Sequence, residues 1–206
     1  MNDHYLTGLH VKGDTMPTIS VEQSLLAKLM SENGCPHDIE DIDHRLPLLG
    51  TDIDSCNEET LDIEIFPDRP DLLSGETLSV AMISFLHNKP TLEDLALTDS
   101  GIEITVDSEL KTIRPIILGA VVKGLQMKDD SEMDSFIKNL MDHQEKLHFA
   151  LGRGRRRASI GVHDLNSIQA PFSVRAVPRT HSFIPLATDT EMDIETILSQ
   201  HPKGVD

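Results

Sequence analysis

The sequence predicts an α+β protein, with a small N-terminal α+β domain followed by part of a second domain that combines a mixed sheet with a long amphipathic helix. Three patterns support this class. Residues 61–66 alternate apolar and acidic side chains, as in a strand with one face on a core and the other in water. Residues 116–122 form an unbroken apolar run, typical of a strand buried on both faces. Residues 131–152 repeat apolar side chains at steps of three and four, which predicts an amphipathic helix.

The N-terminal domain is expected to span residues 16–98. Residues 1–15 lack apolar periodicity, so we interpret them as a tail or an extension. From Val21 the apolar side chains have helical spacing, which predicts one short helix with Ser20 as its N-cap. Residues 33–60 are acidic and carry little periodicity, and we interpret them as a loop or a pair of strands.

A rigid turn is predicted directly after the alternating strand, at residues 67–71. Its two prolines fix their own φ and disfavour helix in the residue before each of them. A helix is expected to follow, with Asp71 or Ser74 as its cap and with its end at residues 88–90, because Asn and Pro are typical of helix ends.

The second domain is expected to span residues 99–206, after an acidic boundary segment. Residues 102–106 alternate and are expected to share one sheet with the apolar run that follows. Ser131 and Asp134 resemble a capping box for the long helix, which should end near Gly152. Further strands are predicted at residues 158–162 and 172–177, and a last helix at residues 193–200. No strand follows to close the sheet, so we expect a truncated domain.

Composition excludes several classes of protein. The formal net charge of -17 argues against a protein that binds nucleic acid over its whole surface, because such binding depends on many Lys and Arg contacts to phosphates. No apolar run has the length of a membrane span, and the opening lacks the features of a signal peptide, so a cytoplasmic protein is expected. Cys35 and Cys56 are not spaced as zinc ligands, and two reduced thiols are expected.

One basic cluster stands out on this acidic chain: Arg153, Arg155, Arg156 and Arg157. Guanidinium groups bind phosphates in a bidentate manner, which favours a local RNA contact. The same charges could instead complement the C-terminal dipole of the long helix. Because the surroundings are negative, we favour a directed contact with RNA or with a carboxylate.

Histidines offer weaker candidates. His143 and His148 lie five residues apart on the long helix, a poor spacing for a shared metal, so no metal site is expected. His163 and Asp164 follow an expected strand, and strand ends open onto clefts. A turn-capping aspartate beside a packed histidine is the commoner explanation. No phosphate-binding glycine loop, nucleophile elbow or zinc-protease motif is present.

Several segments resemble a known family. Residues 66–74 read FPDRPDLLS and resemble the asparagine–arginine–proline–aspartate–leucine–leucine–serine signature of phenylalanyl-tRNA synthetase beta subunits, with Asp68 in place of the usual asparagine. MPTISV at residues 16–21, QEKLH at residues 144–148 and IGVHDL at residues 160–165 follow the family in order. The arginine-rich segment is similar to archaeal members, and the resemblance covers about residues 16–206.

The resemblance implies an N-terminal part of an archaeal or eukaryotic-type beta subunit, truncated within the domain that hydrolyses tyrosine wrongly attached to phenylalanine tRNA. It implies a synthetase with two alpha and two beta subunits, in which the alpha subunit handles ATP, magnesium and phenylalanine, so no cofactor is expected in this chain. It further suggests that His163 and Asp164 line the editing groove and that the four arginines hold RNA phosphates. The catalytic residues stay unassigned.

Two other functions are compatible with the sequence. A freestanding hydrolase would release tyrosine from mischarged phenylalanine tRNA without any partner. A non-catalytic protein-interaction module would have kept the fold and lost the site, and the acidic surface is its only support.

Overall fold

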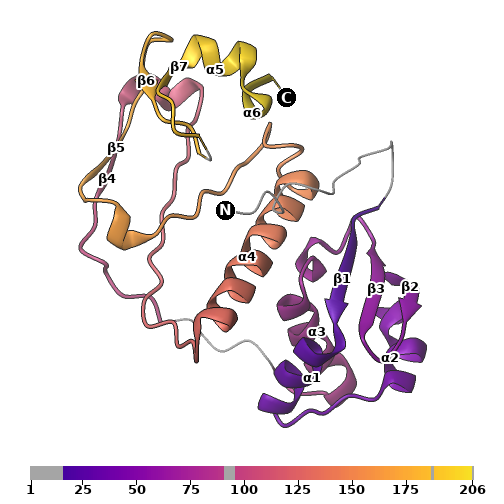
Figure 1. Ribbon diagram of the computed structural model, residues 1–206. Helices are drawn as coiled ribbons and strands as arrows, with labels where there is room; N and C mark the ends of the chain where they lie inside the picture. The colour runs from indigo at the N-terminus through magenta and orange to yellow at the C-terminus, as the bar shows by residue number, and fades with distance from the viewer. Residues whose placement is uncertain (1–15, 91–95, 187, 206) are drawn as a thin grey trace. The chain divides into compact units, whose positions relative to one another are not determined.

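The computed structural model describes residues 16–90, 96–186 and 188–205. They form two compact units, each described here by itself: residues up to 96 together with residues 126–162, and residues 97–125 together with those from 163 onward. Helices and small sheets are present in both units, which confirms the α+β class (Figure 1). The linear division into domains 16–98 and 99–206 stays a prediction, and the expected tail at residues 1–15 lies outside the described residues.

The first unit contains a three-stranded antiparallel sheet in the order β1-β3-β2. Its strands are β1 (Thr18–Glu22), β2 (Thr51–Cys56) and β3 (Thr60–Ile65). Along the central strand β3, Leu61, Ile63 and Ile65 are fully buried, and the residues between them are partly exposed. The alternation therefore confirms the strand predicted at residues 61–66.

Helices α1 (Gln23–Glu32) and α3 (Gly75–His87) lie side by side and bury apolar side chains in the same core as the strands (Figure 1). The expected helix start at Ser20 is wrong, because residues 18–22 pair with β3 and Glu22 occupies the N-cap. Helix α3 starts as expected: the Ser74 hydroxyl accepts a hydrogen bond from the Thr77 backbone N–H at 3.2 Å.

The segment at residues 33–60 is more regular than a loop. It contains α2 (Ile39–Arg45), the 3-10 helix η1 (Leu46–Leu49) and β2. Sequence periodicity missed α2 because it is only two turns long and buries a single side chain, Ile42. The strand-pair alternative is right only for β2, which pairs with β3.

The predicted turn after β3 is present and ends in the 3-10 helix η2 (Pro70–Leu72). Arg69 holds it closed: Nε and Nη2 donate to the two carboxylate oxygens of Asp71 at 3.0 and 2.8 Å, and Nη1 donates to the Leu49 carbonyl. One guanidinium therefore ties this turn to the end of η1.

The long helix α4 (Asp130–Ala150) confirms the helix expected at residues 131–152. Its cap is Asp129, whose carboxylate accepts from the Glu132 N–H at 2.9 Å, so the capping box at Ser131 is wrong. Near its other end, Leu147 and Ala150 pack against the core of the first unit. Lys28 pairs with Glu132 at 2.6 Å and adds a polar link to α1.

The second unit holds two short sheets. Strand β4 (Ile104–Val106) pairs in parallel with β5 (Phe172–Val174), and β6 (Ser182–Phe183) pairs antiparallel with β7 (Met192–Asp193). The remaining elements are the 3-10 helices η3 (Ser108–Thr112) and η4 (Leu165–Ser167) and the helices α5 (Ile194–Gln200) and α6 (Pro202–Val205). The strands and the helix expected at residues 102–106, 172–177 and 193–200 are therefore present, although the strands are shorter than expected.

Two predicted strands are wrong. Residues 116–122 form no strand, and Ile116, Leu118 and Val122 are 74%, 88% and 74% exposed. An apolar run favours burial but does not provide a ladder partner, and β4 pairs with β5 instead. Residues 158–162 also form no strand, because the backbone of Ile160 is bonded to side chains of α4.

Among the described helices, none combines the length and apolar character that crossing a membrane requires.

Candidate functional site

The arginine cluster forms a tight loop after α4, which we call the arginine loop (residues 152–157). Three consecutive residues adopt the left-handed conformation, with φ of 49° at Arg153, 60° at Gly154 and 64° at Arg155. Side chains other than glycine rarely adopt this conformation, because Cβ then approaches the backbone. The loop therefore has a specific conformation that other interactions must maintain.

Backbone hydrogen bonds supply those interactions. The Gly152 N–H donates to the Leu147 carbonyl at 2.9 Å, and the Gly154 N–H donates to the His148 carbonyl at 2.9 Å. The Arg157 N–H closes the loop onto the Gly152 carbonyl at 2.8 Å. The last carbonyls of a helix need such partners, and here the loop backbone provides them for Leu147 and His148. The arginine side chains are not needed to cap α4.

The side chains divide into one paired arginine and three free ones. Arg155 forms an ion pair with Glu145 on α4. Arg153, Arg156 and Arg157 are exposed, and their guanidinium groups form no hydrogen bond or ion pair with any residue that the structure describes. Three closely spaced, unpaired guanidinium groups suit an anionic ligand with several phosphates. This arrangement favours the directed-contact reading over the helix-dipole reading.

The other candidate pair, His163 and Asp164, belongs to the second unit. Asp164 Oδ1 accepts from the Asn166 backbone N–H at 2.9 Å, and Oδ2 accepts from the Ser167 hydroxyl at 2.9 Å. Both bonds favour the ionised carboxylate, so they hold the pKa of Asp164 below its ordinary value; the bond from the Asn166 backbone contributes most. The carboxylate therefore caps η4, which is the turn-capping explanation. His163 is exposed and forms no hydrogen bond or ion pair within the described part of the chain.

Two side chains of α4 hold the arginine loop in place: His148, which the sequence offered only as a poor metal ligand, and Gln144, which it did not offer as a site residue. The backbone N–H of Ile160 donates to His148 Nε2 at 2.7 Å, and Gln144 Nε2 donates to the Ile160 carbonyl. His148 is buried, with 3% of its surface exposed. One feature of the sequence could have indicated this contact: Gln144 is a polar side chain within the apolar stripe of α4, and a half-buried amide needs hydrogen-bond partners.

No group of three or more potential metal ligands occurs among the described residues. His143 and His148 do not come together: His148 faces Ile160, and His143 is half-buried beside Glu76, with a pKa lowered mainly by desolvation.

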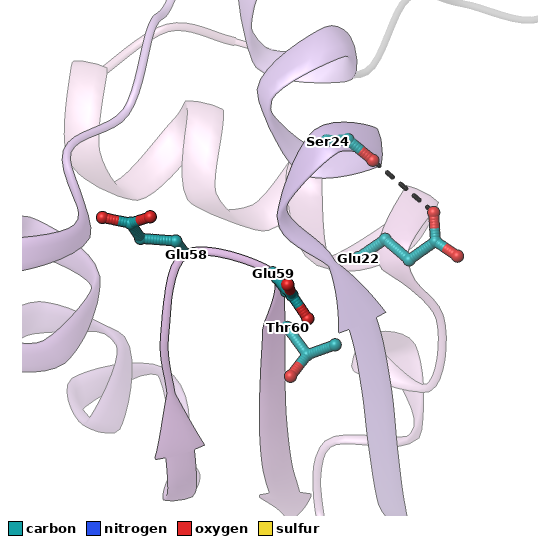
Figure 2. Close-up of a pocket in the computed structure, with 5 residues that line it drawn as sticks. All are labelled: Glu22, Ser24, Glu58, Glu59 and Thr60. Carbon is teal, nitrogen blue, oxygen red and sulfur yellow. Dashed lines mark hydrogen bonds between the residues drawn. The ribbon is translucent and has the colours of Figure 1, made fainter.

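A hollow of about 430 Å³ lies where β1, α1 and β3 meet (Figure 2). Its lining carries the carboxylates of Glu22, Glu58 and Glu59, with Ser24 bonded to Glu22 at 3.5 Å. Such a surface repels polyanions.

Known proteins resemble this chain over most of its length. No family model matches it. The phenylalanine–tRNA ligase beta subunit of Methanococcoides burtonii is 40% identical over 190 residues, which are 92% of this chain and 33% of that relative. The corresponding subunit of Methanothrix thermoacetophila is 44% identical over 163 residues, 78% of this chain and 29% of that relative. The chain thus spans about a third of the length of the curated relatives it matches.

A solved structure resembles this chain as well. The crystal structure of an N-terminal fragment of the phenylalanyl-tRNA synthetase beta subunit from Pyrococcus horikoshii matches with a TM-score of 0.78 and 29% sequence identity. The match covers 92% of this chain and 54% of that one. The fold is therefore shared with that fragment over nearly the whole chain.

Proposed function

Because the chain belongs to the family of the phenylalanine–tRNA ligase beta subunits and matches an N-terminal part of them, we propose that it contacts phenylalanine tRNA through the arginine loop. The observation that carries the proposal is the presence of three free guanidinium groups on a loop whose own hydrogen bonds do not use them. On a chain with a net charge of -17, this loop is a local site of opposite sign. Phosphates of folded RNA fit such a site because each can accept two guanidinium hydrogen bonds.

The test is binding of phenylalanine tRNA by the purified chain, measured by fluorescence anisotropy at fixed salt. Replacing Arg153, Arg156 and Arg157 by Ala removes the free charges and leaves the Arg155–Glu145 pair intact. We expect at least about tenfold weaker binding from the loss of three phosphate contacts. The matched control replaces Lys111, Lys123 and Arg175, three exposed cations of the second unit, by Ala and removes the same charge. Equal losses in both variants would attribute binding to net charge alone and reject the loop.

In the complete subunit we propose that this part supports attachment of phenylalanine to its tRNA, together with an alpha subunit that handles ATP and magnesium. The assembly has two alpha and two beta subunits and works in the cytoplasm. What supports this is the likeness to beta subunits over 92% of the chain. Adding purified alpha subunit and measuring the charging of tRNA tests it. Full charging with this chain as the only beta component would contradict the view that the chain is an incomplete subunit.

We further propose a contribution to hydrolysis of tyrosine from mischarged phenylalanine tRNA. The support is the exposed imidazole of His163, whose two ring nitrogens can donate and accept hydrogen bonds. Asp164 is assigned to holding the adjacent turn, since both its oxygens are occupied. Release of tyrosine from tyrosyl-tRNA measures the activity, and His163→Ala should lower it without changing tRNA affinity. Unchanged release in that variant would remove His163 from the site.

A further inference from the structure

The arginine loop is held at two places, and the second is a clamp on the backbone of Ile160. The chain leaves α4 at Ala150 and contacts the same helix again three residues after Arg157. There, both polar backbone groups of Ile160 are bonded to α4 side chains: its N–H to His148 Nε2 at 2.7 Å and its carbonyl to Gln144 Nε2. The segment between the helix end and the clamp contains all four arginines.

The chemistry of His148 makes this clamp conditional. A ring nitrogen can accept a hydrogen bond only with its lone pair, so Nε2 is unprotonated and a neutral ring carries its proton on Nδ1. Nδ1 lies 3.6 Å from Glu145 Oε1, too far for a hydrogen bond, and it is buried without a partner among the described residues. Protonating Nε2 would place two N–H donors against each other. The clamp therefore requires the neutral imidazole.

The charged groups around His148 do not remove the need for a neutral ring. From α4, Glu145 faces Nδ1, and from the arginine loop Arg155 binds the same carboxylate oxygen. From the segment at Ile160, the group bonded to the ring is a backbone N–H, which carries no charge. Glu145, shared with Arg155, can stabilise a proton on Nδ1. Among the described residues, however, Nε2 has no hydrogen-bond partner besides the Ile160 N–H, so a proton on Nε2 would find no acceptor there.

We propose that His148 is a positioning residue: its neutral imidazole, together with Gln144, fixes the arginine loop for RNA, and its protonation releases the loop. The inference rests on the proposed function, because RNA is taken as the ligand of the loop. A released loop must be ordered again when RNA binds, and that ordering lowers affinity. RNA affinity is thus coupled to the protonation state of one buried histidine, because only the neutral ring accepts the Ile160 hydrogen bond.

Three variants test the proposal. His148→Gln keeps an acceptor that reaches Ile160 but cannot titrate. His148→Leu removes the acceptor and keeps an apolar side chain in the buried position. Gln144→Leu opens the other half of the clamp and serves if His148→Leu does not fold. The first readout is amide hydrogen exchange over residues 153–160 without RNA, corrected for the intrinsic effect of pH, and the second is affinity for phenylalanine tRNA.

At pH 7.5 the wild type and His148→Gln should be protected, and His148→Leu should exchange at least about fivefold faster. As the pH is lowered, exchange in the wild type should approach that in His148→Leu, whereas His148→Gln stays protected. Affinity should fall several-fold in His148→Leu and less than about twofold in His148→Gln. Nitrogen chemical shifts of His148 should give a neutral ring with its proton on Nδ1 at pH 7.5.

Equal exchange in the wild type and His148→Leu at pH 7.5, or equal pH dependence in the wild type and His148→Gln, would overturn the clamp. Exchange as expected with unchanged affinity in His148→Leu would overturn its role in RNA binding. The proposed function fails separately, when the arginine substitutions leave affinity unchanged, because the exchange readout contains no RNA. A loss of affinity in the arginine variant without the exchange pattern keeps the RNA site and rejects the clamp.

Discussion

Gly152→Ala should open the arginine loop. A Cβ at this position would lie 2.5 Å from the Ala158 carbonyl oxygen, 2.6 Å from the His148 carbonyl oxygen and 3.0 Å from the His148 Cα. All three atoms belong to the backbone, so no change of side-chain rotamer relieves the contacts. Overpacking of this kind costs about 1–3 kcal/mol, which is comparable to the few hydrogen bonds that close the loop. The loop should therefore leave the end of α4.

The matched control is Gly154→Ala, two residues further along. Gly154 also adopts a left-handed conformation, with φ of 60°, but a Cβ there would meet no atom within 4 Å. Its cost is conformational strain alone, about 1 kcal/mol. Hydrogen exchange of residues 153–160 and tRNA affinity should both change strongly in Gly152→Ala and weakly in Gly154→Ala. If both variants behave alike, close contact at Gly152 is not what shapes the loop.

Two further predictions concern the scaffold. Arg69→Ala should lower the free energy of unfolding by about 1 kcal/mol at pH 7, a small value because the Asp71 side chain is 60% exposed and water screens the pair. The hydrogen bonds from Arg69 hold the pKa of Asp71 below its ordinary value, so this contribution is present above the ordinary carboxyl range and is lost as pH falls through the lowered pKa. Urea titrations should show wild type and variant converging in acid, and a constant difference would reject the pair as its source. Ser74→Ala should cost about 1 kcal/mol by removing the cap of α3, which thermal unfolding can measure, and an unchanged midpoint would contradict that role.

The elements that the sequence predicted well are those with long, regular patterns and a local end signal. Helix α4 and strand β3 repeat their apolar side chains over enough residues to define one face, and α3 carries its cap at Ser74. Strand β1 was missed because Val21 fits a helical stripe, whereas pairing with Leu61 places it in the sheet. That competition is decided by a strand forty residues away, which local periodicity does not contain.

The run at residues 116–122 failed for a related reason. Its apolar character indicates a need for burial, but the choice of ladder partner depends on the parallel pairing of Ile104 with Phe172, which are far apart in the sequence. Nothing in the run itself specifies that pairing.

The candidate site was predictable in part. Clustering of arginines is visible in the sequence, and so is the helix end that precedes them. Which guanidinium groups are free depends on contacts: Arg155 meets Glu145 ten residues earlier, and the backbone rather than any arginine side chain caps α4. The bond from Ile160 to His148 spans twelve residues and has no spacing rule, so the clamp became evident only from the structure.

The most direct test of the central claim is the salt dependence of binding to phenylalanine tRNA. Each phosphate that a cation neutralises contributes about 0.7–0.9 to the slope of log affinity against log salt concentration. If the free guanidinium groups of Arg153, Arg156 and Arg157 contact phosphates, replacing all three by Ala should reduce that slope by about 2–3. Parallel lines for the wild type and this variant would contradict the account, whatever their separation, because the arginines would then release no counterions on binding.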